Sequence, residues 1–141
     1  MLLVLDASFI AKWFKEEGYT ETSLKIKEEF VRGEHDIVVP DLLLYELTNA
    51  MRYDKSFDSD AIKRSITSLI DLGIDIIIPT VDLIAVSADL ARKFGISVYD
   101  AVYIALSDKL DATFVTADKK LYEKISSLDF AKFITDLHVD K

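Results

Sequence analysis

The chain has 141 residues, half of them hydrophobic, no cysteine and a formal net charge of −8. This length suits one domain with a substantial core, and the missing cysteines exclude disulfides, thiolate zinc sites and cysteine nucleophiles. The acidic balance argues against a general nucleic-acid binder, whose affinity comes largely from Lys and Arg on phosphates. The net charge does not exclude a metal-dependent enzyme, because a bound cation reverses the electrostatic field at its site.

Short apolar runs alternate with longer amphipathic segments along the chain. In order, we expect a strand at 2–5, helices at 7–14 and 20–32, a strand at 37–39, helices at 42–53 and 58–72, a strand at 74–78, helices at 81–94 and 97–110, a strand at 113–115, a helix at 118–127 and an edge strand at 133–134. Such alternation is typical of an α/β three-layer sandwich with a mainly parallel, about five-stranded sheet. The two helices after the second strand should form a hairpin standing off this sheet. We treat residues 1–141 as a single domain.

The apolar start of the chain does not look like a signal peptide. It meets Asp6 at once and has no basic segment before it. No uninterrupted apolar stretch approaches the roughly 18 residues of a membrane span. We therefore expect a soluble, cytoplasmic protein without membrane association.

Four acidic residues stand near the points where predicted strands give way to helices. Asp6 follows the first strand and Asp118 the strand at 113–115, while Glu46 and Asp100 each lie about one turn into a helix. The carboxyl ends of parallel strands share one crevice, so we expect these four side chains to meet. Crowded carboxylates need a counter-charge, which Mg²⁺ supplies through oxygen ligands. The set predicts a metal-dependent hydrolase of a phosphodiester.

Each acid also has a plain structural interpretation. Asp6 and Asp118 are good helix N-caps, and Asp100 completes a Ser-x-x-Asp capping box that begins at Ser97. Glu46 could belong to the solvent-facing stripe of its helix. The metal hypothesis rests on the set rather than on any single member.

Four short motifs contain these acids: Leu5-Asp6-Ala7-Ser8, Leu44-Tyr45-Glu46-Leu47, Tyr99-Asp100-Ala101-Val102-Tyr103 and Thr116-Ala117-Asp118. Together and in this order they resemble the acidic motifs of PIN-domain nucleases. The chain is most similar to the VapC-type ribonuclease toxins of toxin–antitoxin pairs. The resemblance spans essentially the whole chain, and all four acidic positions are present.

The resemblance implies a five-stranded, mainly parallel sheet with an acidic pocket for Mg²⁺ or Mn²⁺. It also implies endonucleolytic cleavage of RNA by a metal-activated water, a homodimer, and a cognate antitoxin that blocks the pocket. On this chain Asp6 and Asp100 would be direct metal ligands, and Glu46 and Asp118 would be ligands or would orient the water. Residues expected to hold these acids in place by hydrogen bonds are Ser8, Asn49 and Thr116.

Other functions stay open at this stage. The chain could be a housekeeping RNA-processing PIN endonuclease, or a non-catalytic α/β module that binds a partner protein. A haloacid-dehalogenase-like phosphatase would carry a second Asp where this chain has Ser8. A metal-free ribonuclease would need both histidines, and we expect His35 and His138 to be solvent-exposed instead.

Basic residues near the motifs could form a rim that holds an RNA backbone, although most such charges on helices are solvated faces. They are Lys12, Lys15, Arg52, Lys119 and Lys120. Trp13 and Phe14 beside them could stack a base, but we expect them to fill the core or an interface.

Overall fold

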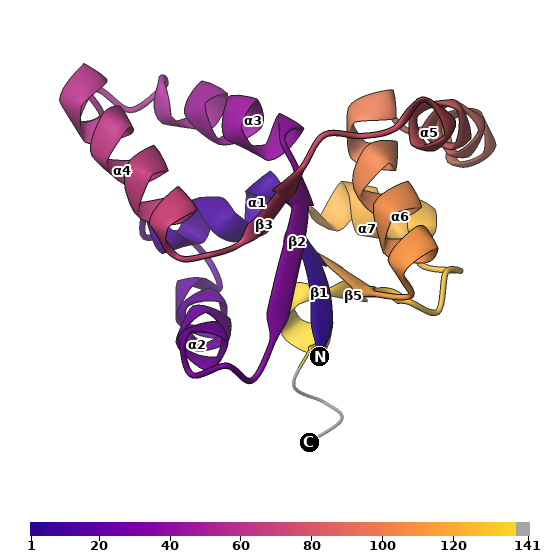
Figure 1. Ribbon diagram of the computed structural model, residues 1–141, viewed down its shortest axis with the longest axis horizontal. Helices are drawn as coiled ribbons and strands as arrows, with labels where there is room; N and C mark the ends of the chain where they lie inside the picture. Colours follow the sequence, from indigo (N-terminus) through magenta and orange to yellow (C-terminus); the bar gives the residue numbers. More distant parts are fainter. Residues whose placement is uncertain (138–141) are drawn as a thin grey trace.

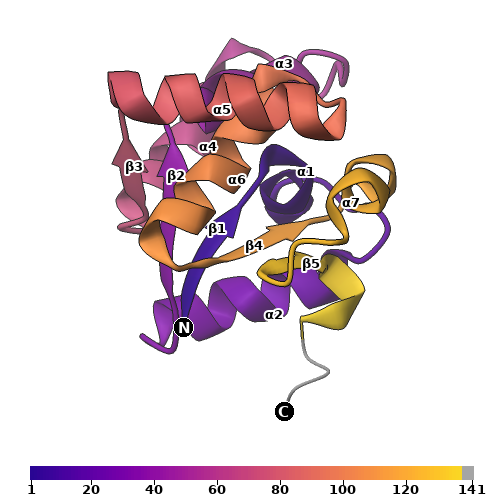
Figure 2. The ribbon, with the colours of Figure 1, turned by 90° about the vertical axis from the view of Figure 1, so that its right-hand side faces the viewer.

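The structure, a computed structural model, describes residues 1–137 and is built on a five-stranded sheet. The order is β3-β2-β1-β4-β5, and every neighbouring pair is parallel, which confirms the predicted α/β architecture. The strands are β1 (Leu2–Leu5), β2 (Asp36–Pro40), β3 (Asp75–Ile77), β4 (Thr113–Thr116) and β5 (Ala131–Phe133). Helices cover both faces of the sheet (Figures 1 and 2).

The helices follow the predicted order, with one division. They are α1 (Ala7–Ile10), the 3₁₀ turn η1 (Ala11–Trp13), α2 (Thr20–Val31), α3 (Leu42–Met51), α4 (Ser59–Asp71), α5 (Val81–Phe94), α6 (Val98–Leu110), α7 (Lys119–Ile125) and the 3₁₀ turn η2 (Ile134–Asp136). The single helix expected at 7–14 is therefore α1 continued by η1. The pair α3 and α4 forms the expected hairpin on the same side of the sheet as α2, with α5 and α6 on the other side (Figure 1).

The predicted edge strand is displaced along the chain, and the start of α3 has no side-chain cap. The edge strand lies at Ala131–Phe133 rather than at 133–134, because Ile134 already begins a 3₁₀ turn after Phe133 has paired with Thr116. Asp41 does not cap α3 with its side chain. Its backbone is already in the right-handed helical region, whereas a capping residue is usually extended.

The core is formed largely by the central strand β1 and the helix α6. Leu3, Val4 and Leu5 of the central strand β1 are fully buried, as expected for a strand covered on both faces. Seven consecutive residues of α6, 101–107, are buried as well. Small side chains at Ala101 and Ala105 let this helix pack closely on the sheet.

Trp13 belongs to the core, as expected, and its indole nitrogen donates a 3.0 Å hydrogen bond to the Ser23 carbonyl. Phe14 is only partly buried and packs against that core. Within residues 1–137, no helix is long and apolar enough to cross a membrane.

Candidate active site

Asp6 ends β1 in a network of hydrogen-bond donors. Its Oδ1 accepts from the Ser8 hydroxyl at 2.6 Å and from the Phe9 amide at 3.1 Å. Its Oδ2 accepts from the Thr116 hydroxyl at 2.5 Å. Asp6 thus caps α1, and it is also a buried carboxylate with both oxygens held in place. The two roles considered for it, helix cap and metal ligand, are therefore compatible.

The same hydroxyls join the end of β1 to the end of β4. The Ala117 amide donates to Ser8 Oγ at 3.0 Å, and the Asp118 amide donates to Thr116 Oγ1 at 3.0 Å. Asp118 then caps α7, because its Oδ1 accepts from the Leu121 amide at 3.1 Å. These hydrogen bonds hold the backbone segment that carries Asp6 next to the segment that carries Asp118.

Asp100 lies in the first turn of α6, near the same edge of the sheet. The Ser97 hydroxyl caps the helix by accepting from the Asp100 amide at 3.1 Å, and the Asp100 side chain is half-buried. Asp100 and Asp118 line one small cavity of about 180 Å³, together with Lys120 and Lys124. The ammonium of Lys124 is tied to the Gly95 carbonyl at 3.1 Å.

Glu46 reaches this edge from α3, and Tyr103 holds it. The Tyr103 hydroxyl donates a 2.7 Å hydrogen bond to Glu46 Oε1, which links α3 to α6. The Tyr103 side chain is almost fully buried, so this bond has little competition from water. The sequence did not single out Tyr103, although its place three residues after Asp100 puts both on one face of the helix.

Burial and the charges of neighbouring acids together raise the pKa values of three of the four carboxyls. Burial raises the pKa of Asp6 to about 6 against the hydrogen bonds that lower it, and the charge of Asp100 adds to the rise. Burial also raises the pKa of Glu46, again with a contribution from Asp100. The pKa of Asp100 itself is raised by burial and by the charge of Asp118. Asp100 therefore interacts with each of the other three acids.

This donor set suits a hard divalent cation. All four groups are carboxylates, and a cation would relieve the mutual repulsion that raises three of their pKa values. Among residues 1–137, no three acidic or histidine side chains are already gathered as a complete metal cage. Mg²⁺ does not require one, because it usually keeps several waters and uses one or two carboxylates.

Two further candidates have partners other than the acids. Asn49 is exposed, and its side-chain oxygen accepts a hydrogen bond from Arg52 Nε at 2.6 Å. His35 is mostly buried beside Glu29 (2.9 Å), so the expectation of an exposed side chain was wrong. It precedes β2, at the opposite ends of the strands, and His138 lies outside the described residues.

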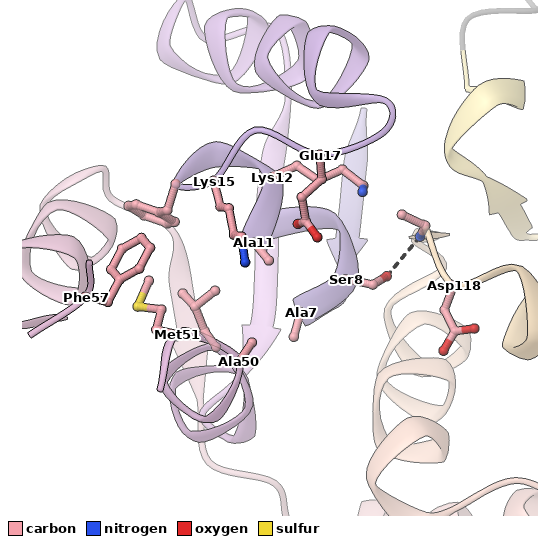
Figure 3. Close-up of a pocket in the computed structure, with 13 residues that line it drawn as sticks. Ala7, Ser8, Ala11, Lys12, Lys15, Glu17, Ala50, Met51, Phe57 and Asp118 are labelled. Atoms are coloured by element: carbon pink, nitrogen blue, oxygen red, sulfur yellow. Dashed lines mark hydrogen bonds between the residues drawn. The ribbon is translucent and has the colours of Figure 1, made fainter. Parts of the chain in front are cut away.

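A larger cavity of about 420 Å³ adjoins the Asp6 network (Figure 3). Ser8 and Asp118 lie at one end, and Met51 and Phe57 form the opposite wall. Lys12, Lys15 and Glu17 from the segment after α1 also line it. The acids thus adjoin a cavity that could admit part of a larger substrate.

Comparisons with known proteins match this chain over most of its length. The family model of the PIN domain matches residues 3–126. A curated relative, ribonuclease VapC3 of Pyrobaculum aerophilum, is 28% identical over 132 residues, which cover 91% of this chain and 98% of the relative.

Solved structures show the same fold. A Pyrobaculum aerophilum protein matches with a TM-score of 0.68 and 21% identity, over 99% of this chain and 97% of that one. VapC20 of Mycobacterium tuberculosis, described as a toxin that cleaves the sarcin–ricin loop, matches with a TM-score of 0.68 and 13% identity, over 86% of this chain and 93% of that one. VapBC2 of Rickettsia felis, bound to a promoter DNA fragment, matches with a TM-score of 0.67 and 12% identity, over 94% and 97%.

Proposed function

The chain belongs to the PIN domain family, and on that premise we propose that it is a metal-dependent endoribonuclease. The observation that carries the proposal is geometric: hydrogen bonds join the segments of Asp6 and Asp118 at the ends of β1 and β4, and Asp100 lines one cavity with Asp118. The raised pKa values of Asp6, Glu46 and Asp100 are consistent with it. The name of the curated relative supports RNA as the substrate. Capping of α1 accounts for Asp6 alone, whereas a metal site also accounts for Asp100 and Asp118 lining one cavity at the same edge of the sheet.

Mg²⁺ or Mn²⁺ would be held by Asp6 and Asp100, with Glu46 and Asp118 as further ligands or as acceptors for a water. When bound, the ion would lower the pKa of an attacking water and neutralise charge on the phosphodiester. Ser8 and Thr116 keep the two oxygens of Asp6 fixed, so this carboxylate needs little reordering. Asn49, three residues after Glu46 on α3, stays the third residue proposed to support the acids, and its oxygen accepts a hydrogen bond from Arg52.

We further propose that the protein is the toxin of a type II toxin–antitoxin pair in the cytoplasm. The curated relative and two of the matched structures bear VapC or VapBC names, which favours this role over housekeeping RNA processing. A cognate antitoxin would be its protein partner.

A homodimer is the proposed state of the enzyme. Large apolar side chains are exposed on α3, just after β3, and at the starts of α5 and α6, which suits contact with a second copy. The most exposed of them are Tyr45, Ile78, Val81 and Tyr99.

The purified protein is expected to cleave single-stranded RNA when Mg²⁺ or Mn²⁺ is present, and to lose that activity in EDTA. Attack by water predicts products with a 5′-phosphate and a 3′-hydroxyl, which mass spectrometry can identify. Cleavage that persists in EDTA would contradict the metal-dependent mechanism. Binding of a protein partner without any RNA cleavage would favour the non-catalytic module.

Tyr103→Phe is expected to lower the cleavage rate roughly 10–100-fold, the usual effect of losing a group that orients a ligand. The phenol would no longer donate to Glu46, so the pKa of this carboxyl should rise further and its position should loosen. Single-turnover assays measure the rate, and the midpoint of Mn²⁺ activation should shift upwards. Tyr19→Phe is the matched control, because this exposed tyrosine makes no side-chain hydrogen bond within residues 1–137. An equal loss in both variants would remove Tyr103 from its positioning role.

A further inference from the structure

Lys12 is an unusual cation in this acidic protein. It lies in η1 and is only 9% exposed, whereas lysines are almost never this buried without a partner. Among residues 1–137 it makes no hydrogen bond and no ion pair. Its ammonium is nevertheless not sealed from solvent, since the one sealed, unpaired side-chain polar atom in that part of the chain is His35 Nδ1.

Lys12 lines the 420 Å³ cavity that adjoins the acids. Ser8, which binds Asp6, lines the cavity four residues earlier in the sequence, so Lys12 follows it by about one turn. Lys15 lines the same cavity but is already paired with Asp54 at 3.6 Å. Lys12 is therefore the lining cation whose charge is available to a ligand.

The rest of the cavity is apolar on one side. Phe14, Met51 and Phe57 line it across from Ser8, as Figure 3 shows for Met51 and Phe57. An aromatic or apolar wall accepts a sugar or a base without sequence preference. A cation on one side and an aromatic wall on the other is the chemistry of a nucleotide subsite.

We propose that this cavity binds one nucleotide of the RNA strand next to the cleaved bond, with its phosphate on Lys12 and its nucleoside against Phe57. The inference rests on the proposed ribonuclease function and adds a substrate-binding site to it. An anionic phosphate would give the buried ammonium the partner that the protein does not supply. Glu17, an exposed carboxylate lining the same cavity, would oppose the anion.

The test measures binding of a fluorescent single-stranded oligouridylate by anisotropy, with Asp100→Asn as the background so that the RNA is not cut. Lys12→Met keeps the length of the stem and removes the charge. We expect it to raise the Kd about tenfold and to reduce the slope of log Kd against log salt by about 0.7, the value for one phosphate on a single strand. Phe57→Leu should raise the Kd with no change in that slope, and Glu17→Gln should lower the Kd.

The controls separate charge from folding. Lys109→Met makes the same change of net charge on the exposed end of α6 and should leave the Kd within about twofold. Lys12→Arg restores the charge and should recover most of the affinity lost in Lys12→Met, which shows that the loss was not a folding defect.

An unchanged Kd and salt slope in Lys12→Met would overturn the subsite. The proposed function fails separately, if the wild-type chain cuts no RNA with Mg²⁺ or Mn²⁺.

Discussion

Asp100→Asn is expected to abolish RNA cleavage while leaving the fold intact. The charges of Asp100 and of each of the other three acids affect one another, so the substitution removes a proposed metal ligand and a charge that a cation would neutralise. Losing several kcal/mol of charge stabilisation corresponds to a rate at least about a thousandfold lower. Gel-based cleavage assays at saturating Mn²⁺ measure this loss, and calorimetry should show weaker Mn²⁺ binding.

The metal-free Asp100→Asn protein should be at least as stable as the wild type at pH 7. Asparagine has nearly the same shape but cannot repel the neighbouring carboxylates, so thermal unfolding should not occur at a lower temperature. Asp108→Asn is the matched control, because this exposed residue lies on the same helix outside the site. Full cleavage by purified Asp100→Asn would remove Asp100 from its assigned role.

The sequence predicted where the acids would lie because strand ends are a property of the fold. Asp6 follows β1 and Asp118 follows β4, and these two strands are neighbours in a parallel sheet. Their carboxyl ends must then share an edge, whatever the details of packing. Ser8 and Thr116 followed from the same logic, since each is two residues from an acid.

Details set by contacts between distant segments could not be predicted from local patterns. Tyr103 contacts Glu46 across 57 positions of sequence, and the apolar pattern of α6 marked it only as a core residue. The burial of Lys12 depends on how η1 meets the neighbouring elements, and a lysine in a short amphipathic segment normally indicates an exposed face. The position of β5 depended on its pairing with β4, which a short apolar run does not specify.

Asn49 shows the limit of inference from spacing. It lies three residues after Glu46, which places both on roughly one side of α3. The helix nonetheless turns Glu46 toward Tyr103 and leaves Asn49 exposed with Arg52. Spacing alone therefore placed Glu46 and Asn49 on one side of α3 but did not predict the partners of their side chains.

The metal-free protein is expected to gain stability from Asp6 as the pH falls from 7 towards 4. Burial raises the pKa of Asp6 from 3.8 to about 6, so the folded state binds a proton more tightly than the unfolded state does. Ionised Asp6 then costs the fold about 3 kcal/mol at neutral pH. The cost begins to fall as the pH drops below about 6, decreases steadily from there, and is absent below 3.8, where both states are protonated.

Denaturant unfolding at a series of pH values, in EDTA, measures this contribution as the difference between the wild type and Asp6→Asn. The subtraction matters because other carboxylates, such as Asp54 with its lowered pKa, change the total in the opposite direction. Saturating Mg²⁺ should make the stability difference independent of pH, since a bound cation keeps Asp6 ionised. The rate of RNA cleavage should rise with pH between 4 and 7, because metal ligands must be deprotonated. Parallel curves for the two proteins in EDTA would contradict the raised pKa. A difference that Mg²⁺ leaves unchanged would mean that Asp6 does not bind the metal.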